Sequence, residues 1–427
     1  MIAFLPNCGF ISEVSRATAI AKALKDRGVP VCFASRGGPY VSLIGAAGFE
    51  CTTLTPTLGA EGSADFLAAL LDMGKGDRPF FAPGELEASV TAEVAWLREV
   101  KATAAVTGFT LSAALSTRVV GIPLVTDHGG SFLPPVLSRG LCPVPVNPPK
   151  AEMSRLPQVV QRWMANRMPA LLKAPVRQLN AHADTLGVER VPSLLSMMCG
   201  DLTLVTELAE VLGTSAESIE RWKPSWPFRV RRGTTFVCTG PLYAKLDAPI
   251  PPEVEAFLSQ PEPVVYLAPT SVQTGFLREL ILSAKPAGAR LLVASTVHDV
   301  KDLGDDRTLI AGVLPNHLVF PRIAAAVIMG GQGSVQCAMA SGTPFIGLPH
   351  HGEQELNVAV AERLGVAIRM APHSLDSLAP AIRRLLDEPS FATSAKAAAQ
   401  RYAGIDGAAR AAQAIVDHLE RRTRAAA

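Results

Sequence analysis

The chain has 427 residues, of which 48% are hydrophobic and 18% are charged. This length supports a large apolar core and favours two or three domains. The formal net charge of +2 gives no general indication of nucleic-acid binding. The seven cysteines include no CxxC pair, a pattern typical of proteins from a reducing cytosol.

The N-terminus, MIAFLPNCGF, lacks both the basic residues that precede a signal-peptide core and a small-residue cleavage site after it. Nowhere does the chain contain 18 consecutive apolar residues, so we predict no membrane-spanning helix. We therefore expect a cytoplasmic protein, a monomer or homodimer, that does not bind nucleic acid.

Apolar strands alternate with amphipathic helices in the first part of the chain. The runs IAFLP and VPVCFAS predict strands, and Ser12 is expected to cap a helix from Glu13 to Arg27 that ends at Gly28. The runs AAVTG and IPLVTDHGG predict further strands. This alternation predicts an α/β fold in which helices cover both faces of a parallel sheet.

Residues 130–200 interrupt the alternation. A proline-rich stretch precedes predicted amphipathic helices that carry Arg162, Arg167, Lys173 and Arg177. A helical insertion beside a sheet often shapes a substrate pocket. Its basic residues are typical of a solvated helix face or, alternatively, of a helix in weak peripheral contact with a membrane.

A second α/β series begins at VVYLAPTS and continues through AAVIMGG and PFIGLP. Prolines punctuate the stretch before it, which we predict to be an interdomain linker. The alanine-rich tail predicts further helices. The predicted organisation is two doubly wound domains: an N-terminal domain of residues 1–240 that contains the insertion at 130–200, a linker of residues 241–263, a C-terminal domain of residues 264–400 and a helical tail of residues 401–427.

A glycine turn follows the predicted strand AAVIM. Gly330, Gly331 and Gly333 are expected to take positive φ and to allow close approach of a ligand, and Ser334 to cap the next helix. Exposed N–H groups and the helix dipole there suit a diphosphate. The turn is neither a Walker loop nor a GxGxxG motif. A tight turn without any ligand is the alternative.

Acidic and amide residues follow the next strand in the pattern PxxxEQxxN, which places Glu353, Gln354 and Asn357 after Pro349. A carboxylate accepts hydrogen bonds from neighbouring hydroxyls, and an amide both donates and accepts them. The pattern therefore favours a polyhydroxylated ligand. The alternative is a helix start that is enriched in glutamate because of the helix dipole.

These patterns, G-G-x-G-S, G-x-P and P-x-x-x-E-Q-x-x-N, resemble the donor-binding signature of the GT-B glycosyltransferases. The group includes UDP-glucosyl and glucuronosyl transferases and bacterial antibiotic and macrolide glycosyltransferases. The resemblance implies two Rossmann-like domains facing across a cleft, the first for the acceptor and the second for the nucleotide sugar. It also implies that the final helix crosses back to the first domain.

The implied reaction moves a sugar from a nucleoside diphosphate, most commonly UDP, to a small-molecule or lipid-like acceptor. It implies inversion without a metal or other cofactor, because backbone amides and a helix dipole replace the metal's charge. The resemblance assigns donor binding to these residues: Thr270 and Ser271 at the phosphates, Val313, Pro315 and Asn316 at the base, Met329, Gly330, Gly331, Gly333 and Ser334 at the diphosphate, and His351, Glu353, Gln354 and Asn357 at the sugar.

Two positions depart from the family pattern. Met329 stands where the family usually has a phosphate-contacting histidine before the glycines. Phe10 stands where the family's G-H-x-x-P motif places the histidine that acts as general base. Asn7, Gly9 and Phe10 are expected in the acceptor cleft.

Three residues are candidates for the missing base: Glu13 at the start of the first helix, and Asp127 and His128 at the end of IPLVT. Glu13 is alternatively a helix-start carboxylate and His128 a loop histidine without a chemical role, and an anionic acceptor would need no base. A non-catalytic homologue that binds sugar nucleotides is a second hypothesis, suggested by Phe10 and Met329. A sugar-nucleotide epimerase is a third.

Overall fold

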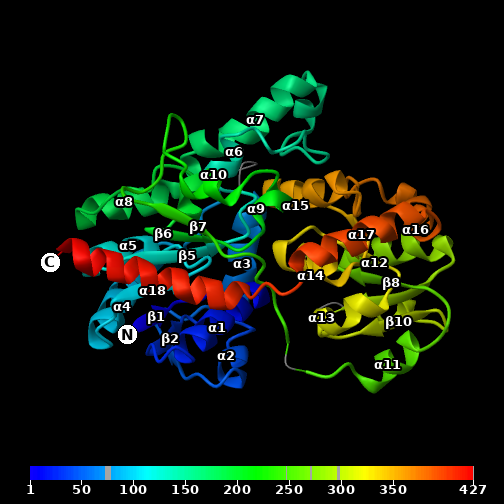
Figure 1. The fold of residues 1–427 in the computed structure, drawn as a ribbon, viewed down its shortest axis with the longest axis horizontal. Coiled ribbons are helices and arrows are strands. Elements are labelled where there is room, and N and C mark those ends of the chain that lie inside the picture. The colour runs from blue at the N-terminus through cyan, green and yellow to red at the C-terminus, as the bar shows by residue number, and fades with distance from the viewer. Residues whose placement is uncertain (73–77, 247, 270–271, 296–298, 427) are drawn as a thin grey trace. The chain divides into compact units, whose positions relative to one another are not determined.

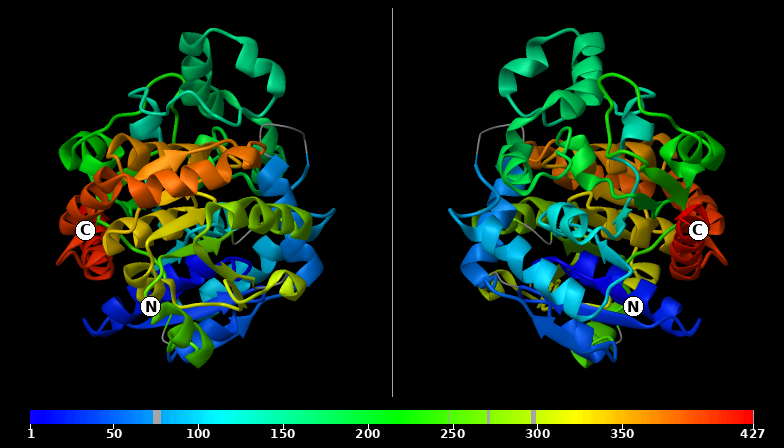
Figure 2. Two further views of the ribbon diagram at one scale, coloured as in Figure 1. Left: turned by 90° about the vertical axis from the view of Figure 1, so that its right-hand side faces the viewer. Right: turned by 90° about the vertical axis from the view of Figure 1, so that its left-hand side faces the viewer.

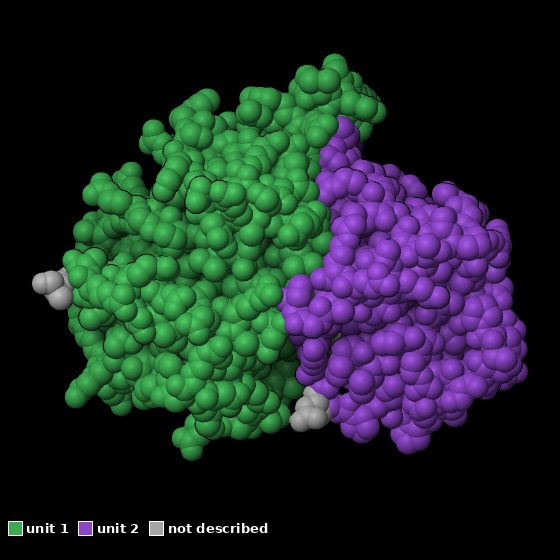
Figure 3. Space-filling model, viewed as in Figure 1, with its two compact units in different colours: residues 1–142, 152–242, 406–427 green, residues 143–151, 243–405 purple. Residues whose placement is uncertain are grey.

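The computed structural model describes residues 1–427 except 73–77, 247, 270–271, 296–298 and 427. The chain forms two compact units, shown in different colours in Figure 3. Unit 1 comprises residues 1–142, 152–242 and 406–427, and unit 2 comprises residues 143–151 and 243–405. Each unit has its own parallel sheet, so the predicted α/β class with two Rossmann-like domains is confirmed.

Unit 1 is built on a seven-stranded parallel sheet in the order β3-β2-β1-β4-β5-β6-β7 (Figure 1). In register, Ile2 pairs with Val31 on one side and with Ala104 on the other. The inner strands are short apolar runs because helices cover both faces of the sheet. The strands are β1 (Ile2–Phe4), β2 (Val31–Ser35), β3 (Cys51–Thr53), β4 (Ala104–Thr107), β5 (Leu124–His128), β6 (Leu202–Val205) and β7 (Thr235–Cys238).

The helices of unit 1 connect these strands and form the insertion. They are α1 (Ile11–Lys25), α2 (Ser42–Ala46), α3 (Ala60–Asp72), α4 (Glu85–Glu99), α5 (Ala113–Val120), α6 (Pro134–Leu137), η1 (Ala151–Arg155), α7 (Gln158–Leu171), η2 (Ala174–Val176), α8 (Arg177–Leu186), η3 (Leu195–Met198), α9 (Ala209–Leu212), α10 (Ala216–Glu220) and α18 (Gly407–Ala426). Within the described residues, every helix is too short or too polar to span a membrane.

The start of α1 differs from the sequence prediction. Phe10 is the N-cap, with extended backbone angles and no side-chain cap, and the helix begins at Ile11. Ser12 is therefore already inside the helix and does not cap it. Gly28 follows the helix with a φ of 72°, as expected for the residue that ends it.

Unit 2 is built on a six-stranded parallel sheet in the order β10-β9-β8-β11-β12-β13. Its strands are β8 (Val264–Ala268), β9 (Arg290–Ala294), β10 (Thr308–Ala311), β11 (Ala325–Ile328), β12 (Phe345–Gly347) and β13 (Ala367–Arg369). Its helices are α11 (Pro252–Leu258), α12 (Thr274–Ala284), η4 (Lys285–Ala287), η5 (Lys301–Leu303), α13 (Asn316–Val319), η6 (Phe320–Arg322), α14 (Gln332–Ser341), α15 (Gly352–Arg363), η7 (Leu375–Ser377), α16 (Leu378–Asp387) and α17 (Pro389–Tyr402).

The predicted linker contains a packed helix. In α11, Val254, Phe257 and Leu258 are buried. The Arg290 guanidinium lies 3.7 Å from the centroid of the Phe257 ring, within the range of a cation–π contact. The prolines that suggested a linker instead place Pro252 in the first turn of this helix.

The helix α18 packs in the core of unit 1. Its buried residues Ala411, Ala412 and Ile415 share a hydrophobic cluster with Val14 and Ile20 of α1. The start of α18 is held closely against the chain, because a Cβ on Gly407 would lie 2.2 Å from the carbonyl oxygen of Pro241. Backbone atoms cannot yield to such a contact without a shift of the helix.

We predict that Gly407→Ala lowers the free energy of unfolding of unit 1 by about 1–3 kcal/mol. All four tryptophans lie in unit 1, so urea unfolding followed by tryptophan fluorescence reports this unit. Gly45→Ala is the matched control, since a Cβ there meets no described atom within 4 Å. An equal effect of the two substitutions would contradict the packing assigned to Gly407.

Candidate active site

In unit 2, the strand order reverses between β8 and β11, and ligands of open parallel sheets bind at such a point beyond the strands' carboxyl ends. The glycine turn follows β11 directly. Gly330 has a φ of 87°, and a Cβ there would lie 2.5 Å from Cγ2 of Val358 and 3.1 Å from the Gln354 carbonyl oxygen. Both the backbone conformation and the close approach of α15 therefore require glycine at this position.

The other residues of the turn differ from the prediction. Gly331 is the N-cap of α14, with a φ of −60°, so it does not take positive φ. Gly333 and Ser334 lie inside the first turn of the helix, so Ser334 does not cap it. The cause is that the helix begins at Gln332, three residues before Val335, where a cap at Ser334 would start it.

The start of α14 is open to a ligand. Apart from the adjacent residues and the backbone of α14 itself, no atom of the described residues lies within 4 Å of a Cβ placed on Gly331 or on Gly333. A helix of ten residues leaves its first N–H groups without partners inside the helix and carries a partial positive charge at this end. This geometry suits a phosphate or diphosphate. Met329 is 5% exposed and offers no polar group to it.

The PxxxEQxxN motif is joined to the glycine turn. Asn357 donates a hydrogen bond from Nδ2 to the Gly330 carbonyl at 3.0 Å, and Gln354 accepts one through Oε1 from the His350 N–H at 2.8 Å. His351 is the N-cap of α15, and Glu353 lies half-buried in its first turn. Asn357 and Gln354 thus hold backbone groups of the two loops.

The residues predicted around a nucleobase lie at the start of α13. Val313 is 51% exposed, and Pro315 is the buried N-cap of the helix. Asn316 accepts a hydrogen bond through Oδ1 from the buried Tyr266 hydroxyl at 2.8 Å. Thr270 and Ser271 lie outside the described residues.

A buried ion pair beside the motif could not be predicted from the sequence. Glu355, 1% exposed, accepts hydrogen bonds from the Asn147 N–H at 2.7 Å and from Arg369 Nη1 at 3.1 Å. Asn147 Nδ2 also donates to the Pro349 carbonyl at 3.2 Å. Burial raises the pKa of Glu355, and these donors oppose that rise. The contacts attach residues 143–151 to unit 2, although the predicted N-terminal domain included them.

In unit 1, the strand order reverses between β1 and β4, and Glu13 bridges the loops that follow these two strands. Its Oε1 accepts hydrogen bonds from the N–H groups of Asn7 at 3.0 Å, Gly108 at 3.0 Å and Phe109 at 2.7 Å. The Thr107 hydroxyl donates a fourth at 3.2 Å. Oε2 is buried and has no hydrogen-bond partner among the described residues. Burial raises the pKa of Glu13 to about 7 despite these donors.

Asp127 and His128 form the end of β5, and both are buried. Arg16 of α1 donates to Asp127 Oδ1 in an ion pair. His128 Nδ1 accepts a hydrogen bond from the Gly130 N–H at 3.1 Å. Burial and the nearby Arg16 charge lower the pKa of His128 to about 3. The imidazole is therefore neutral near pH 7 and a weak base.

Phe10 is part of an aromatic cluster. Its ring makes edge-to-face contacts with Phe66 and Phe109, with centroids 6.1 and 6.3 Å away. Beside it, Asn7 Oδ1 accepts a hydrogen bond from the Gly9 N–H at 3.0 Å. The residue that replaces the family's histidine thus has a packing role.

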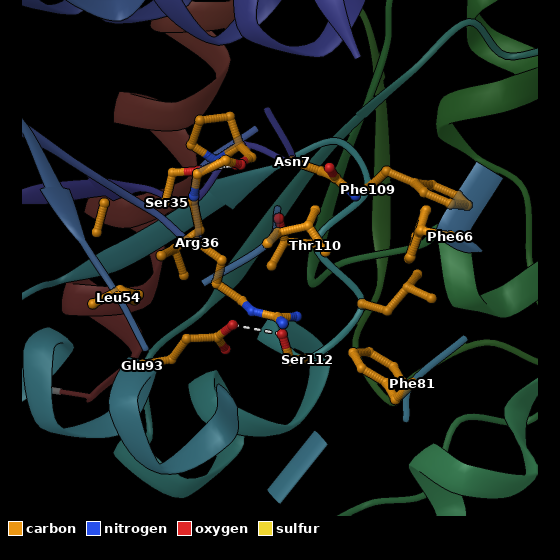
Figure 4. A pocket seen from close by; sticks show the side chains of 16 residues that line it. Asn7, Ser35, Arg36, Leu54, Phe66, Phe81, Glu93, Phe109, Thr110 and Ser112 are labelled. Atoms are coloured by element: carbon orange, nitrogen blue, oxygen red, sulfur yellow. Dashed lines mark hydrogen bonds between the residues drawn. The ribbon is translucent and has the colours of Figure 1, made fainter. Parts of the chain in front are cut away.

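A pocket of about 30 Å³ lies beyond the ends of β1, β2 and β4, and a volume of this size holds about one water. Figure 4 shows Phe66, Phe81 and Phe109 on one side of it and the Arg36 guanidinium near Glu93 and Ser112. The pocket therefore combines apolar walls with a polar floor.

Glu93 is the buried acid of this floor, with 1% of its surface exposed. Its Oε1 accepts a hydrogen bond from the Ser112 hydroxyl at 2.5 Å. Oε2 makes no hydrogen bond within the described part of the chain, although the Ser116 hydroxyl is near enough to favour the charged form. Burial outweighs both serines and raises the pKa of Glu93 to about 7.

Comparisons with known proteins agree with this arrangement. Residues 220–398 match the family model described as UDP-glucoronosyl and UDP-glucosyl transferase. The vancomycin aglycone glucosyltransferase of Amycolatopsis orientalis is 26% identical over 332 residues, covering 74% of this chain and 75% of that protein. The chain is a glycosyltransferase with a GT-B fold, and it is similar to the enzymes of the UDP-glycosyltransferase type.

Solved structures share the whole fold of this glycosyltransferase. Spinosyn forosaminyltransferase SpnP matches with a TM-score of 0.65 and 14% identity over 98% of this chain and 99% of that one. The glycosyltransferase VinC, solved in complex with dTDP, matches with a TM-score of 0.64 and 17% identity over 99% and 100%. In the described part of the glycosyltransferase, no group of three or more His, Cys, Asp or Glu is placed to hold a metal ion.

We predict that Glu93→Gln changes how the stability of the glycosyltransferase depends on pH. The pKa of Glu93 is about 7 in the fold against an ordinary 4.5, so its contribution is intact below pH 4.5 and is lost as the pH rises to 7. The free energy of unfolding of the variant, relative to the wild type, should therefore increase by about 3 kcal/mol across this range.

Urea unfolding followed by tryptophan fluorescence measures this difference in unit 1. Glu13 titrates in both proteins, so its effect cancels. Glu87→Gln changes an exposed acid on the same helix and should give no such slope. A constant difference between Glu93→Gln and the wild type over the pH range would show that Glu93 has an ordinary pKa.

Proposed function

We propose that this glycosyltransferase moves a sugar from a nucleoside diphosphate to a hydroxyl group of a natural product, with inversion and without a required metal. The observation that carries the proposal is the open start of α14 at the strand reversal of unit 2. There the N–H groups and the helix dipole suit the donor diphosphate. Uridine and thymidine donors are both candidates, because the matched family is described by UDP and VinC was solved with dTDP.

In the proposed reaction, the acceptor oxygen attacks the anomeric carbon of the sugar. The bond from this carbon to the diphosphate oxygen breaks, and the electron pair leaves with the nucleoside diphosphate. A base accepts the proton of the acceptor hydroxyl. The N–H groups at the start of α14 stabilise the charge that develops on the diphosphate, a task that a metal ion performs elsewhere.

Glu13 is the proposed base. Asp127 is neutralised by its ion pair with Arg16, and His128 is a weak base because its pKa is lowered to about 3. Glu13 keeps one oxygen, Oε2, without a hydrogen bond to the described residues, and its pKa of about 7 suits a base that works near neutral pH. Its other oxygen is fixed by the loops after β1 and β4, which orients the carboxylate.

The pocket lined by Glu93 is the proposed site for part of the acceptor. Phe66, Phe81 and Phe109 offer apolar and aromatic walls, and Glu93 Oε2 offers an acceptor for one hydroxyl or amine. A volume of about 30 Å³ admits one small polar group of the acceptor. The relatives named for a vancomycin aglycone and for a spinosyn support a natural-product acceptor.

The donor site is tested with Gly331→Asp and Gly331→Asn. The position has negative φ and open space, and both residues are good N-caps, so both variants should fold. The aspartate places a negative charge beside the diphosphate. We therefore expect the Gly331→Asp variant to have a dissociation constant for UDP or dTDP roughly tenfold or more above that of the Gly331→Asn variant.

Isothermal titration with UDP, dTDP, GDP and ADP measures these constants. The wild type should bind one of the first two with the same affinity in magnesium and in EDTA. If the two variants bind the nucleotide with equal affinity, the diphosphate does not bind at the start of α14. A strict magnesium requirement would contradict the metal-independent site.

The base is tested with Glu13→Gln, which keeps an oxygen for the loop N–H groups. We expect kcat to fall roughly 10²- to 10⁴-fold while the affinity for the nucleotide is unchanged. In the wild type, kcat/KM should fall tenfold per pH unit below about pH 7, because protonation of Glu13 removes the base.

Matched controls are His128→Gln and Asp127→Asn, assayed with the donor that the titration identifies. If Glu13→Gln retains full turnover and one of these variants does not, the base is at β5. If the wild type binds the nucleotide sugar but transfers sugar to no acceptor of a natural-product panel, the protein is a binding homologue rather than a working transferase.

A further inference from the structure

The first half of the helix α7 exposes large apolar side chains, whereas two polar side chains of the helix are buried. On its outer face, Val159 is 81% exposed and Trp163 is 48% exposed. On its inner face, Gln161 and Asn166 are buried. Figures 1 and 2 show α7 standing away from the sheet of unit 1. This is the reverse of an ordinary surface helix, which turns its apolar stripe to the core.

The inner face is stabilised by hydrogen bonds. Gln161 Nε2 donates to the Leu156 carbonyl at 2.7 Å. Asn166 accepts from the Cys142 N–H at 2.9 Å and donates to its carbonyl at 2.8 Å. These bonds fix the orientation of α7, so the exposure of its outer face follows from the fold. The apolar side chains of that face are not needed for packing within unit 1.

Four exposed apolar residues lie at the start of α7 or just before it, and we name them the α7 stripe: Leu156, Val159, Val160 and Trp163. Val159, Val160 and Trp163 lie three and four residues apart on one helix face, and Leu156 lies two residues before the helix begins. Leu156 and Val160 are 38% and 39% exposed. A single exposed apolar residue is ordinary, whereas a contiguous apolar patch with polar surroundings marks an interaction surface.

The residues around the stripe are basic. Residues 152–167 contain three arginines, Arg155, Arg162 and Arg167, and one acid, Glu152, a net charge of +2. The Arg167 guanidinium lies 6.0 Å from the Trp163 ring centroid, which brings a cation to the apolar stripe. Tryptophan and aliphatic residues on one face, flanked by arginines, are typical of helices that lie in the interface of an anionic bilayer.

We propose that the α7 stripe docks this protein on membranes that contain anionic lipids. The charge argues against a second copy of the chain as the occupant, since a symmetric contact would bring two surfaces of net charge +2 together. An anionic bilayer instead attracts the arginines while its headgroup region accepts Trp163 and the valines. Membrane docking is separate from the proposed function, and it does not depend on which acceptor receives the sugar.

The test measures co-sedimentation of the full chain with vesicles. One set is phosphatidylcholine alone, and the other is an equimolar mixture with phosphatidylglycerol. We expect binding to the mixture that weakens with salt. The variant Val159→Ser/Trp163→Ser should lose roughly tenfold or more in partition coefficient, because two apolar side chains no longer leave water. Leu282→Ser, which changes a 53% exposed leucine of α12, should leave it unchanged.

A second variant, Arg155→Gln/Arg162→Gln, separates the charge from the apolar contact. It should reduce binding to the mixture towards the level seen with phosphatidylcholine alone. The proposal is overturned if the wild type binds neither vesicle, or if the serine variant binds as the wild type does. It is also overturned if sedimentation velocity shows a dimer that the serine variant abolishes, because the stripe would then join two copies.

Discussion

The close packing of α15 against the turn after β11 is the contact on which the proposed donor site depends. Val358 occupies the space that a side chain on Gly330 would need, and Asn357 holds the carbonyl of the same glycine. The turn therefore keeps its positive φ and leads directly into α14, whose first N–H groups have no partner inside the helix. Because α15 also begins at the PxxxEQxxN motif, the same helix fixes this motif relative to the glycine turn.

At the strand reversal of unit 1, the fold buries a carboxylate, that of Glu13. Taking Glu13 out of water disfavours its charge, and the three backbone N–H groups and one hydroxyl at Oε1 offset only part of that cost. The carboxylate is consequently both rigid and easily protonated. The charge of Arg16 lowers the pKa of Glu13, and the charge of Asp127 raises it. The ion pair between Arg16 and Asp127 therefore influences the basicity of Glu13.

Apolar runs were sufficient to predict the inner strands and the two doubly wound sheets, since burial on both faces leaves a continuous signal. Edge strands such as β3 (Cys51–Thr53) were missed because they are half exposed. Helix starts were misplaced at Ser12 and Ser334, where the chain turns helical before the serine and no side-chain cap forms. Contacts between distant residues gave no local signal: Glu355 holds Asn147 from 208 positions away. The sequence analysis also missed Glu93, because the pattern of an amphipathic helix does not distinguish a buried glutamate from an exposed one.

The two histidines that the family pattern would supply are replaced by Phe10 and Met329, and both replacements are explained by packing. Met329 lies in the core of unit 2, and Phe10 packs against the core of unit 1. An apolar residue at each position strengthens the core but removes a group that can carry charge. Under the proposed function, the diphosphate is then bound by backbone N–H groups, whose dipoles do not titrate, whereas the acceptor proton passes to a side chain that does titrate. Under the proposed function, only the replacement of the base histidine by Phe10 makes catalysis depend on another residue. Glu13 is the proposed substitute because its buried carboxylate lies at the strand reversal of unit 1 and keeps Oε2 without a hydrogen bond to the described residues.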